Sequence, residues 1–335
     1  QSSVDPRLHV GLGTRAIDSL VVVWPDARTE TRTDIAPNQT ITIRQEDATS
    51  SASVVDTAAG EPLFRGVDDS LGIDFRHEEN TSFNDFRREP LMPHRLSQEG
   101  PAVAVGDVTG DGLDDVYLGG AKWQSGALYV QQSDGRFQLD DASEEVWGAD
   151  RKREDVDATF FDANGDGALD LYVVSAGNEF WGNADALRDR LYLNDGSGVF
   201  RRAKNALPED VASNGAAVAP GDFDDDGDVD LFVGSRVVAR HYGKTPTSYL
   251  LENDGSGHFT DTVTCLSEYA TAAIAPHDYD RDGDLDLAIG AFPGTVQVLL
   301  NQRDGAVLTD TNPFSTTTPV ILETFMEYIP YDLAW

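Results

Sequence analysis

Four nine-residue segments carry oxygen-bearing side chains at one shared spacing, which suits a divalent cation. Each has Asp at position 1, Asp, Asn or Thr at position 3, Asp at position 5, Gly at position 6 and Asp at position 9. Calcium takes about six to eight oxygen ligands, and alternate residues of a tight turn supply them when glycine lets the chain fold back. A single segment of this kind would be read as an acidic surface turn, but four in register predict calcium loops. The segments are 107–115, 162–170, 222–230 and 278–286.

The predicted ligands are the side chains at positions 1, 3, 5 and 9 and the main-chain carbonyl at position 7. About four structural Ca²⁺ ions per chain are therefore expected. Thr109 is a neutral ligand, so the first loop is expected to bind more weakly than the third, where every side-chain ligand is Asp. The complete predicted set is Asp107, Thr109, Asp111, Leu113 and Asp115; Asp162, Asn164, Asp166, Ala168 and Asp170; Asp222, Asp224, Asp226, Asp228 and Asp230; Asp278, Asp280, Asp282, Asp284 and Asp286.

The residues around the loops predict strands rather than helices. An EF-hand requires a bidentate Glu at position 12, but Leu118, Val173, Val233 and Ile289 stand there. Short runs rich in β-branched and aromatic residues flank each loop, and they are too short for helices. Two further hairpin signals, at 194–198 and 253–257, contain Asp-Gly turns between apolar runs. Each repeat is thus predicted to be four antiparallel strands with calcium held in the first hairpin.

The spacing of the repeats predicts the architecture. The first-ligand aspartates stand at 107, 162, 222 and 278, which are 55, 60 and 56 residues apart. Four-stranded units at this spacing are typical of β-propeller blades, whereas the repeats of a calcium-binding β-helix are far shorter. Over about 100–310 the sequence resembles the FG-GAP or VCBS repeats of integrin-like propellers. That resemblance implies an all-β propeller in which the calcium loop joins the first two strands of each blade.

Residues 1–44 are predicted to form a separate small β module. Strands are expected at Leu8–Val10, Ser19–Trp24 and Thr40–Ile43. The stretch 11–16 fits a dinucleotide-binding fingerprint, but a strand follows where that fingerprint needs a helix, so cofactor binding is excluded. The residues Pro6–Gly13, Trp24-Pro25 and Asn38-Gln39 resemble the ASPIC/UnbV domain, and this resemblance gives no chemical activity to transfer to the chain. Residues 45–62 are small and polar and predict a linker, and the propeller is expected over 63–335.

Both edges of the predicted propeller raise the question of ring closure. Strands without a metal loop are expected near 72–75 and 83–86. Residues 331–335 are similar to the strand that precedes each loop, as if a further blade were starting. We expect a fragment of a longer protein, cut at both ends. The alternative is a five-bladed ring, in which the last strand pairs with strands from 63–90 because an open propeller leaves an unpaired sheet edge.

Composition limits the partners and the compartment. The chain has 59 acidic and 25 basic residues and a net charge of −34, which argues against nucleic-acid binding because that needs a basic surface. Low lysine with high aspartate fits a halophilic source, and an ordinary acidic exported protein fits equally well. Cys265 is the single cysteine, so no intramolecular disulfide forms. The sequence contains no apolar stretch long enough for a membrane span, and an extracellular, cell-surface or periplasmic location is expected from the calcium loops.

The sequence favours binding over catalysis. It lacks the His-Glu-x-x-His and Gly-x-Ser-x-Gly motifs, and its six histidines are scattered. The preferred hypothesis is a non-catalytic binding or adhesion module for a protein or glycan ligand. A glycan lyase or hydrolase on a propeller scaffold is the alternative, and a purely structural piece of a surface protein is the third. The ligand could meet Trp123, Trp147, Phe180, Trp181, His241 or Tyr242, although each of these residues could instead pack between blades.

Overall fold

The computed structural model describes two compact units of the chain, Gln1–Gly66 and Val67–Trp335, which are treated separately below. The predicted strands at 8–10 and 331–335, together with Trp181 and Cys265, lie outside the described residues. The described residues are 17–24, 28–37, 39–48, 50–51, 66, 68–79, 81–180, 184–209, 211, 214–264, 270–292, 295–301 and 314–315.

The N-terminal unit contains a three-stranded antiparallel sheet. Strand β1 (Ile17–Val23) pairs with β2 (Arg28–Ile35), and β2 pairs in turn with the short β3 (Ser50–Ser51). The strand predicted at Ser19–Trp24 is therefore present as β1. The strand predicted at Thr40–Ile43 is absent, because these residues are irregular and lead into a 3-10 turn, η1 (Gln45–Asp47). Strand β3 lies inside the segment predicted as a linker.

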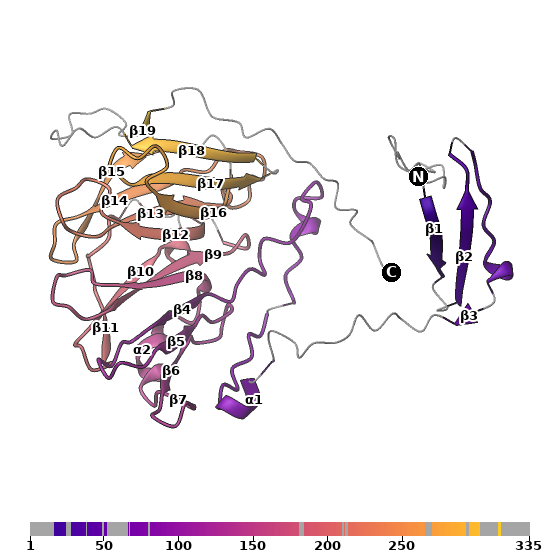
Figure 1. The fold of residues 1–335 in the computed structure, drawn as a ribbon. Coiled ribbons are helices and arrows are strands. Elements are labelled where there is room, and N and C mark those ends of the chain that lie inside the picture. The colour runs from indigo at the N-terminus through magenta and orange to yellow at the C-terminus, as the bar shows by residue number, and fades with distance from the viewer. Residues whose placement is uncertain are drawn as a thin grey trace. The chain divides into compact units, whose positions relative to one another are not determined.

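The second unit is all-β, with four four-stranded antiparallel sheets in a propeller-like arrangement (Figure 1). In each sheet the strands follow one another in chain order, as successive hairpins require. The first sheet contains β4 (Val103–Gly106), β5 (Asp115–Leu118), β6 (Ala127–Gln131) and β7 (Phe137–Leu139). The second contains β8 (Glu154–Phe161), β9 (Asp170–Ala176), β10 (Arg190–Asn194) and β11 (Phe200–Arg202). The third contains β12 (Gly215–Gly221), β13 (Asp230–Ser235), β14 (Tyr249–Asn253) and β15 (Phe259–Thr264). The fourth contains β16 (Ala270–His277), β17 (Asp286–Phe292), β18 (Thr295–Asn301) and β19 (Phe314–Ser315).

The second strands of the second and third sheets are covered on both faces. Every residue of β9 and of β13 is buried, which explains why these strands are nearly continuous apolar runs. The outer strand β7 is instead partly or fully exposed along its length. The sheets therefore pack face to face, with their central strands between two neighbours.

The core is divided into layers between successive sheets. Leu171 and Tyr192 belong to a cluster shared by the first and second sheets, Leu231 to one shared by the second and third, and Leu287 to one shared by the third and fourth. The first strands of neighbouring sheets lie side by side, since β8 contacts both β4 and β12, and β12 contacts β16. This order matches blades arranged around an axis, with the first strand innermost.

The segment that precedes the first sheet is largely irregular. A short helix, α1 (Asp68–Leu71), and a 3-10 turn, η2 (Asp85–Arg87), are its regular elements. The predictions of strands at 72–75 and 83–86 were therefore wrong. Phe86 is 37% exposed, and the side chain of Asn84 caps η2 by accepting from the Phe86 amide at 3.1 Å.

Three further short helical elements lie between strands. They are α2 (Ser143–Trp147), η3 (Gly148–Asp150) and η4 (Asp185–Leu187). Trp147 ends α2 and is buried against Tyr117 and Tyr192, with ring centroids 5.2 and 4.6 Å away in edge-on geometry. Trp147 is thus a core residue rather than a ligand contact. None of the helices in the described residues is long and apolar enough to cross a membrane.

Candidate metal centres

Each predicted calcium loop connects the first and second strands of its sheet. The loops 107–115, 162–170, 222–230 and 278–286 leave β4, β8, β12 and β16 and enter β5, β9, β13 and β17, sharing their last residue with the entering strand. The prediction that the loop forms the first hairpin of each blade is therefore confirmed. All four loops lie at the same end of their sheets, because every first strand runs in the same sense towards its loop.

The aspartate at position 1 organises the turn. The side chain of Asp107 accepts hydrogen bonds from the amides of Gly110 (2.7 Å), Asp111 (3.1 Å) and Gly112 (2.7 Å). These amide bonds lower the pKa of Asp107, although burial opposes the shift. The glycine at position 6 has the positive φ that the sequence predicted, for example 87° at Gly112. The turn therefore keeps the position 1 carboxylate on the inside of the loop.

Carboxylates converge in the third and fourth loops. Oxygens of Asp222, Asp224 and Asp226 lie within 4.8 Å of one another in the third loop. Oxygens of Asp278, Asp280 and Asp286 do the same in the fourth, so positions 1, 3 and 9 face one centre there. Such a cluster of hard oxygen donors fits calcium.

Position 4 is a constraint that sequence reasoning missed. The backbone has positive φ at this position in all four loops: 74° at Gly110, 71° at Gly165, 58° at Asp225 and 67° at Arg281. The first two loops use glycine, which takes this conformation without strain, while the last two place a side chain there. The Gly-x-Gly pattern of the first two loops was the available signal.

The aspartate at position 9 joins the loop to the third strand of the same sheet. In the second sheet, Asp170 accepts from the amides of Ala163 (3.0 Å) and Asn194 (2.8 Å), one at each carboxylate oxygen. Asp115, Asp230 and Asp286 make the equivalent pair of bonds, and all four side chains are buried. Burial raises the pKa of Asp170 to about 6 and that of Asp230 to about 7. Position 9 is thus a structural link as well as a predicted ligand.

In the second, third and fourth sheets, an asparagine on the third strand bonds the loop of the preceding sheet. Asn194 donates from Nδ2 to the Val108 carbonyl (2.8 Å), and Asn253 donates to that of Ala163 (2.8 Å). Asn301 repeats the contact with Phe223 (2.8 Å). Each acceptor is position 2 of a loop, whose amide is bonded to its own position 9 aspartate. We call this series, which runs through all four sheets from Asp115 to Tyr279, the amide relay. The Asn-Asp-Gly turns predict a hairpin from the sequence, but they do not predict the contact of their asparagine with the preceding loop.

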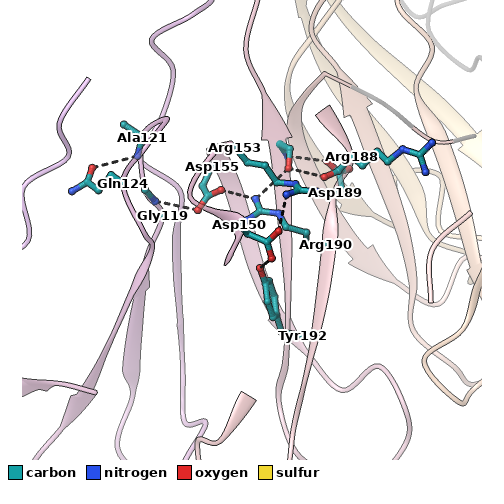
Figure 2. A network of polar contacts seen from close by, with 12 residues as sticks. Gly119, Ala121, Gln124, Asp150, Arg153, Asp155, Arg188, Asp189, Arg190 and Tyr192 are labelled. Carbon is teal, nitrogen blue, oxygen red and sulfur yellow. Dashed lines mark hydrogen bonds and ion pairs between the residues drawn. The ribbon is translucent and has the colours of Figure 1, made fainter. Parts of the chain in front are cut away.

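A network of buried ion pairs joins the first and second sheets (Figure 2). Arg190 contacts Asp155 at 2.5 Å, and the other oxygen of Asp155 accepts from the Tyr117 hydroxyl (3.0 Å) and the Gly120 amide (3.1 Å). Asp150 accepts from Arg153 (2.6 Å) and from the Tyr192 hydroxyl (2.7 Å). Every carboxylate oxygen in this network therefore has a donor. It has the character of a structural ion-pair network.

Aromatic residues named from the sequence gather at the end of the sheets opposite the loops. Trp123 is 57% exposed, and its φ of 76° is unusual for a bulky residue. The neighbouring Lys122 lies 4.3 Å above the Phe180 ring. Arg240 bonds the carbonyls of Glu179 and Phe180 and is followed by His241 and Tyr242. Of the residues predicted to meet a ligand, Trp123, Phe180, His241 and Tyr242 thus lie at this end of the sheets, where Tyr242 packs against the buried Met92, Leu96 and Val237.

The comparisons with known proteins support the repeat assignment. Residues 1–50 match the family model for ASPIC and UnbV, and residues 107–173 and 162–233 match the model for an FG-GAP-like repeat. The resemblances inferred from the sequence are confirmed for these residues. The fourth loop lies outside the matched residues but has the same position 6 and position 9 geometry. No curated protein matches the chain.

Two solved structures are distantly similar. A thermostable family-43 glycoside hydrolase has 9% identity and a TM-score of 0.40, covering 68% of this chain and 77% of its own. A putative exo-beta-1,3-galactanase from Bifidobacterium bifidum s17 has 12% identity and a TM-score of 0.37, covering 62% of this chain and 72% of its own. At these scores neither likeness bears on the activity of this chain.

Proposed function

We propose that this chain is a calcium-stabilised propeller segment that acts as a non-catalytic binding or adhesion module outside the cell, at its surface or in the periplasm. The observation that carries the proposal is the convergence of carboxylate oxygens in the loops, with three within 4.8 Å in each of the third and fourth. Position 1, 3, 5 and 9 side chains and the position 7 carbonyl would hold calcium there. The ion would neutralise the repulsion between aspartates that the turn forces together.

The calcium is structural in this proposal. The loops join two strands of one sheet and, through the amide relay, contact the next sheet. An ion that binds only the folded chain stabilises it by mass action, by ~2.7 kcal/mol at a hundredfold excess over its dissociation constant. Loops of this kind suit the free calcium found outside cells, which supports an external location.

The test is metal analysis and thermal unfolding at high salt, with calcium added and then chelated. About four ions per chain and a melting temperature that rises with calcium are expected. Asp226→Asn, at loop position 5, should remove one ion. Asp225→Asn is the matched control, because it makes the same charge change at the adjacent exposed residue, which is not a predicted ligand. Absence of bound calcium, or equal loss of calcium in both variants, would overturn the proposal.

The proposed ligand face is the end that carries Trp123, Phe180, His241 and Tyr242. An exposed Trp beside charged residues suits a glycan or a protein loop. Trp123→Ala should reduce retention on a panel of immobilised polysaccharides or extracellular proteins, while its calcium content and melting temperature stay unchanged. If the variant is retained as well as the wild type on every member of the panel, Trp123 does not contribute to ligand binding.

A glycan-active enzyme is the second candidate. The observation that favours it is the gathering of Glu79, Glu99 and Glu179 at the same end as Trp123, because paired carboxylates perform glycoside hydrolysis. The same polysaccharide panel separates the two functions when the release of reducing ends is measured together with retention. Turnover that is lost in Glu99→Gln would establish the enzyme, and retention without turnover would support the binding module.

A further inference from the structure

The irregular stretch 81–88, which precedes the first sheet, lines an open cavity of about 560 Å³. This volume lies within the ~300–1,000 Å³ that is typical of small-ligand sites. No residue of the lining belongs to a predicted calcium loop or to the buried ion-pair network of Asp150 and Asp155. The lining residues are Thr81, Ser82, Phe83, Asn84, Arg87 and Arg88.

The lining is basic although the chain is strongly acidic. The chain has 59 acidic residues against 25 basic ones, yet two arginines and no acid line the cavity. Arg87 is exposed, and its guanidinium has no hydrogen bond or ion pair with the residues that the structure describes. Arg88 has a buried Nε without a hydrogen-bond partner, which is a costly arrangement for a donor. Both arginines therefore retain donors that no described residue satisfies.

The guanidinium of Arg88 is held in place by the protein. Its Nη2 donates to the Asn178 carbonyl, and its central carbon lies 4.9 Å from the centre of the Phe83 ring. The backbone of this stretch is anchored by Asp85, which is buried and accepts from Ser97 Oγ at 2.5 Å and from Asn178 Nδ2 at 3.1 Å. Arg88 is thus positioned before a ligand arrives, which lowers the entropic cost of binding.

The acids next to the cavity already have partners. Glu89 accepts from the Tyr242 amide at 2.7 Å with one oxygen and from Asn178 Nδ2 at 2.9 Å with the other. Asp85 likewise uses both of its oxygens, for Ser97 and Asn178. Neither carboxylate lines the cavity, so the charged groups that an incoming anion contacts are the two guanidiniums.

The rest of the lining indicates the kind of anion. Guanidinium groups bind a carboxylate through paired, parallel hydrogen bonds. Thr81 and Ser82 add exposed hydroxyls and Asn84 adds an exposed amide, which are suitable partners for the hydroxyl groups of a sugar. The one apolar side chain of the lining, Phe83, already has Arg88 over its ring, which leaves little apolar surface for a peptide side chain.

We propose that this cavity binds an acidic sugar, the uronic acid residue of a glycan, whose carboxylate is held by Arg87 and Arg88. The site rests on the proposed function, because it names the class of glycan that the binding module takes. It adjoins the proposed ligand face, since Arg88 bonds the carbonyl of Asn178, two residues before Phe180.

The experiment titrates the full chain with D-galacturonic acid and with D-galactose, its neutral counterpart, and measures binding by calorimetry and ligand-observed NMR. The neutral sugar should bind at least about tenfold more weakly than the acid. Arg87→Gln should weaken binding of the acid about tenfold or more and leave the melting temperature unchanged, because Arg87 is exposed. Arg136→Gln, the same substitution at an exposed arginine of the β6–β7 turn, should leave binding unchanged.

Arg88→Lys keeps the charge but loses the forked geometry, so it should also weaken binding of the acid. No binding of galacturonic acid to the wild type, or equal binding to the wild type and Arg87→Gln, would overturn the site. Acetate bound as tightly as galacturonic acid would overturn the sugar assignment, because a general anion site needs no sugar. Galactose 6-sulfate bound more tightly than galacturonic acid would replace the uronic acid with a sulfated sugar.

The proposed function fails or stands by other measurements. The calcium loops are tested by Asp226→Asn and the ligand face by Trp123→Ala on the panel. Retention on the panel that depends on Trp123, without binding of galacturonic acid, would support the binding module and reject the cavity as its acidic-sugar site. Binding of galacturonic acid that depends on Arg87, without any retention that depends on Trp123, would support the cavity and reject the ligand face.

Discussion

The side-chain amide of Asn253 lies 2.8 Å from the carbonyl oxygen of Ala163, a residue 90 positions earlier in the chain and in the preceding sheet. The same Nδ2 also donates to the Val229 carbonyl at 3.1 Å, and Asn253 is buried. One asparagine thus satisfies carbonyls in two successive predicted calcium loops. The contact between sheets is polar at this end, although their faces pack through apolar side chains.

Replacing Asn253 with alanine should therefore destabilise the fold. The substitution leaves two carbonyls without a donor in a buried place, which costs about 1–3 kcal/mol each. The free energy of unfolding, measured in urea with saturating calcium, should fall by about 2–4 kcal/mol in total. Ser256→Ala, an exposed substitution in the following turn, should change it by less than about 0.5 kcal/mol. Equal effects of the two substitutions would show that the asparagine contact contributes nothing.

The buried pair of Arg190 and Asp155 should be more sensitive than a partly exposed pair. Arg190→Met leaves Asp155 buried without its cation and is expected to cost about 3–5 kcal/mol. Arg202→Met also removes an arginine from a buried aspartate, but Arg202 is 35% exposed and Asp150 keeps Arg153. Its cost should stay within about 1 kcal/mol. Urea unfolding of both variants gives the comparison, and a reversed order would contradict the description of the network.

The third loop position should set the calcium affinity of a loop. Thr109→Asp adds a carboxylate to the first loop and should tighten its calcium binding, while the same change should destabilise the calcium-free chain through added repulsion. Asp224→Asn in the third loop is the reciprocal variant and should weaken binding there. Isothermal titration with calcium measures both effects. If the calcium affinity is unchanged in both variants, the side chain at position 3 is not a calcium ligand.

The contribution of His94 to stability should fall on mild acidification, while the raised pKa values of Asp170 and Asp230 act in the opposite direction. Burial lowers the pKa of His94 below its usual 6.5, and the Arg236 guanidinium, 3.1 Å from His94 Nε2, lowers it further, against a smaller opposing effect of Asp85. The unfolded chain therefore takes up a proton near pH 6.5 that the folded chain refuses. The contribution is complete above that pH and is lost as the pH falls through the lowered pKa.

The His94→Gln variant should remove this part of the pH dependence. Glutamine still offers an oxygen to Arg236 but does not titrate. The free energy of unfolding at pH 7.5, 6.5 and 5.5 should decline less steeply in the variant than in the wild type. His258→Gln, the same substitution at an exposed histidine, is the comparison variant. If the free energy of unfolding of the variant depends on pH as steeply as that of the wild type, protonation of His94 does not affect stability.

Much of the propeller-like unit could be predicted from spacing alone. Glycine at position 6 and aspartate at position 9 recur with apolar runs around them, so the loops and both hairpins of each sheet follow from local rules. The strands predicted at 72–75 and 83–86 were wrong because residues 73–79 are irregular and the side chain of Asn84 caps a 3-10 turn at Asp85–Arg87. Trp147 also serves tertiary packing, because it lies in the core against Tyr117 and Tyr192.

The contacts between sheets could not be predicted in the same way. Asn194 and Val108 are 86 residues apart, and nothing local shows that one meets the other. The burial of individual acids is equally hard to predict, because Glu79, Glu154 and Glu179 lie among many other acids in a strongly acidic sequence. Only the fold reveals which of them are buried without a donor.

The amide relay also defines what a duplication of this repeat must copy. A sheet cut out at its own boundaries, such as 154–202, carries an asparagine whose acceptor belongs to the previous sheet and a loop whose donor belongs to the next. The segment that contains both partners of one junction is therefore offset from the sheet boundaries, because it runs from a loop to the third strand of the following sheet. Recombination or design that respects this offset would preserve every junction, whereas exchange of whole sheets would preserve them only if both partners carry the same asparagine.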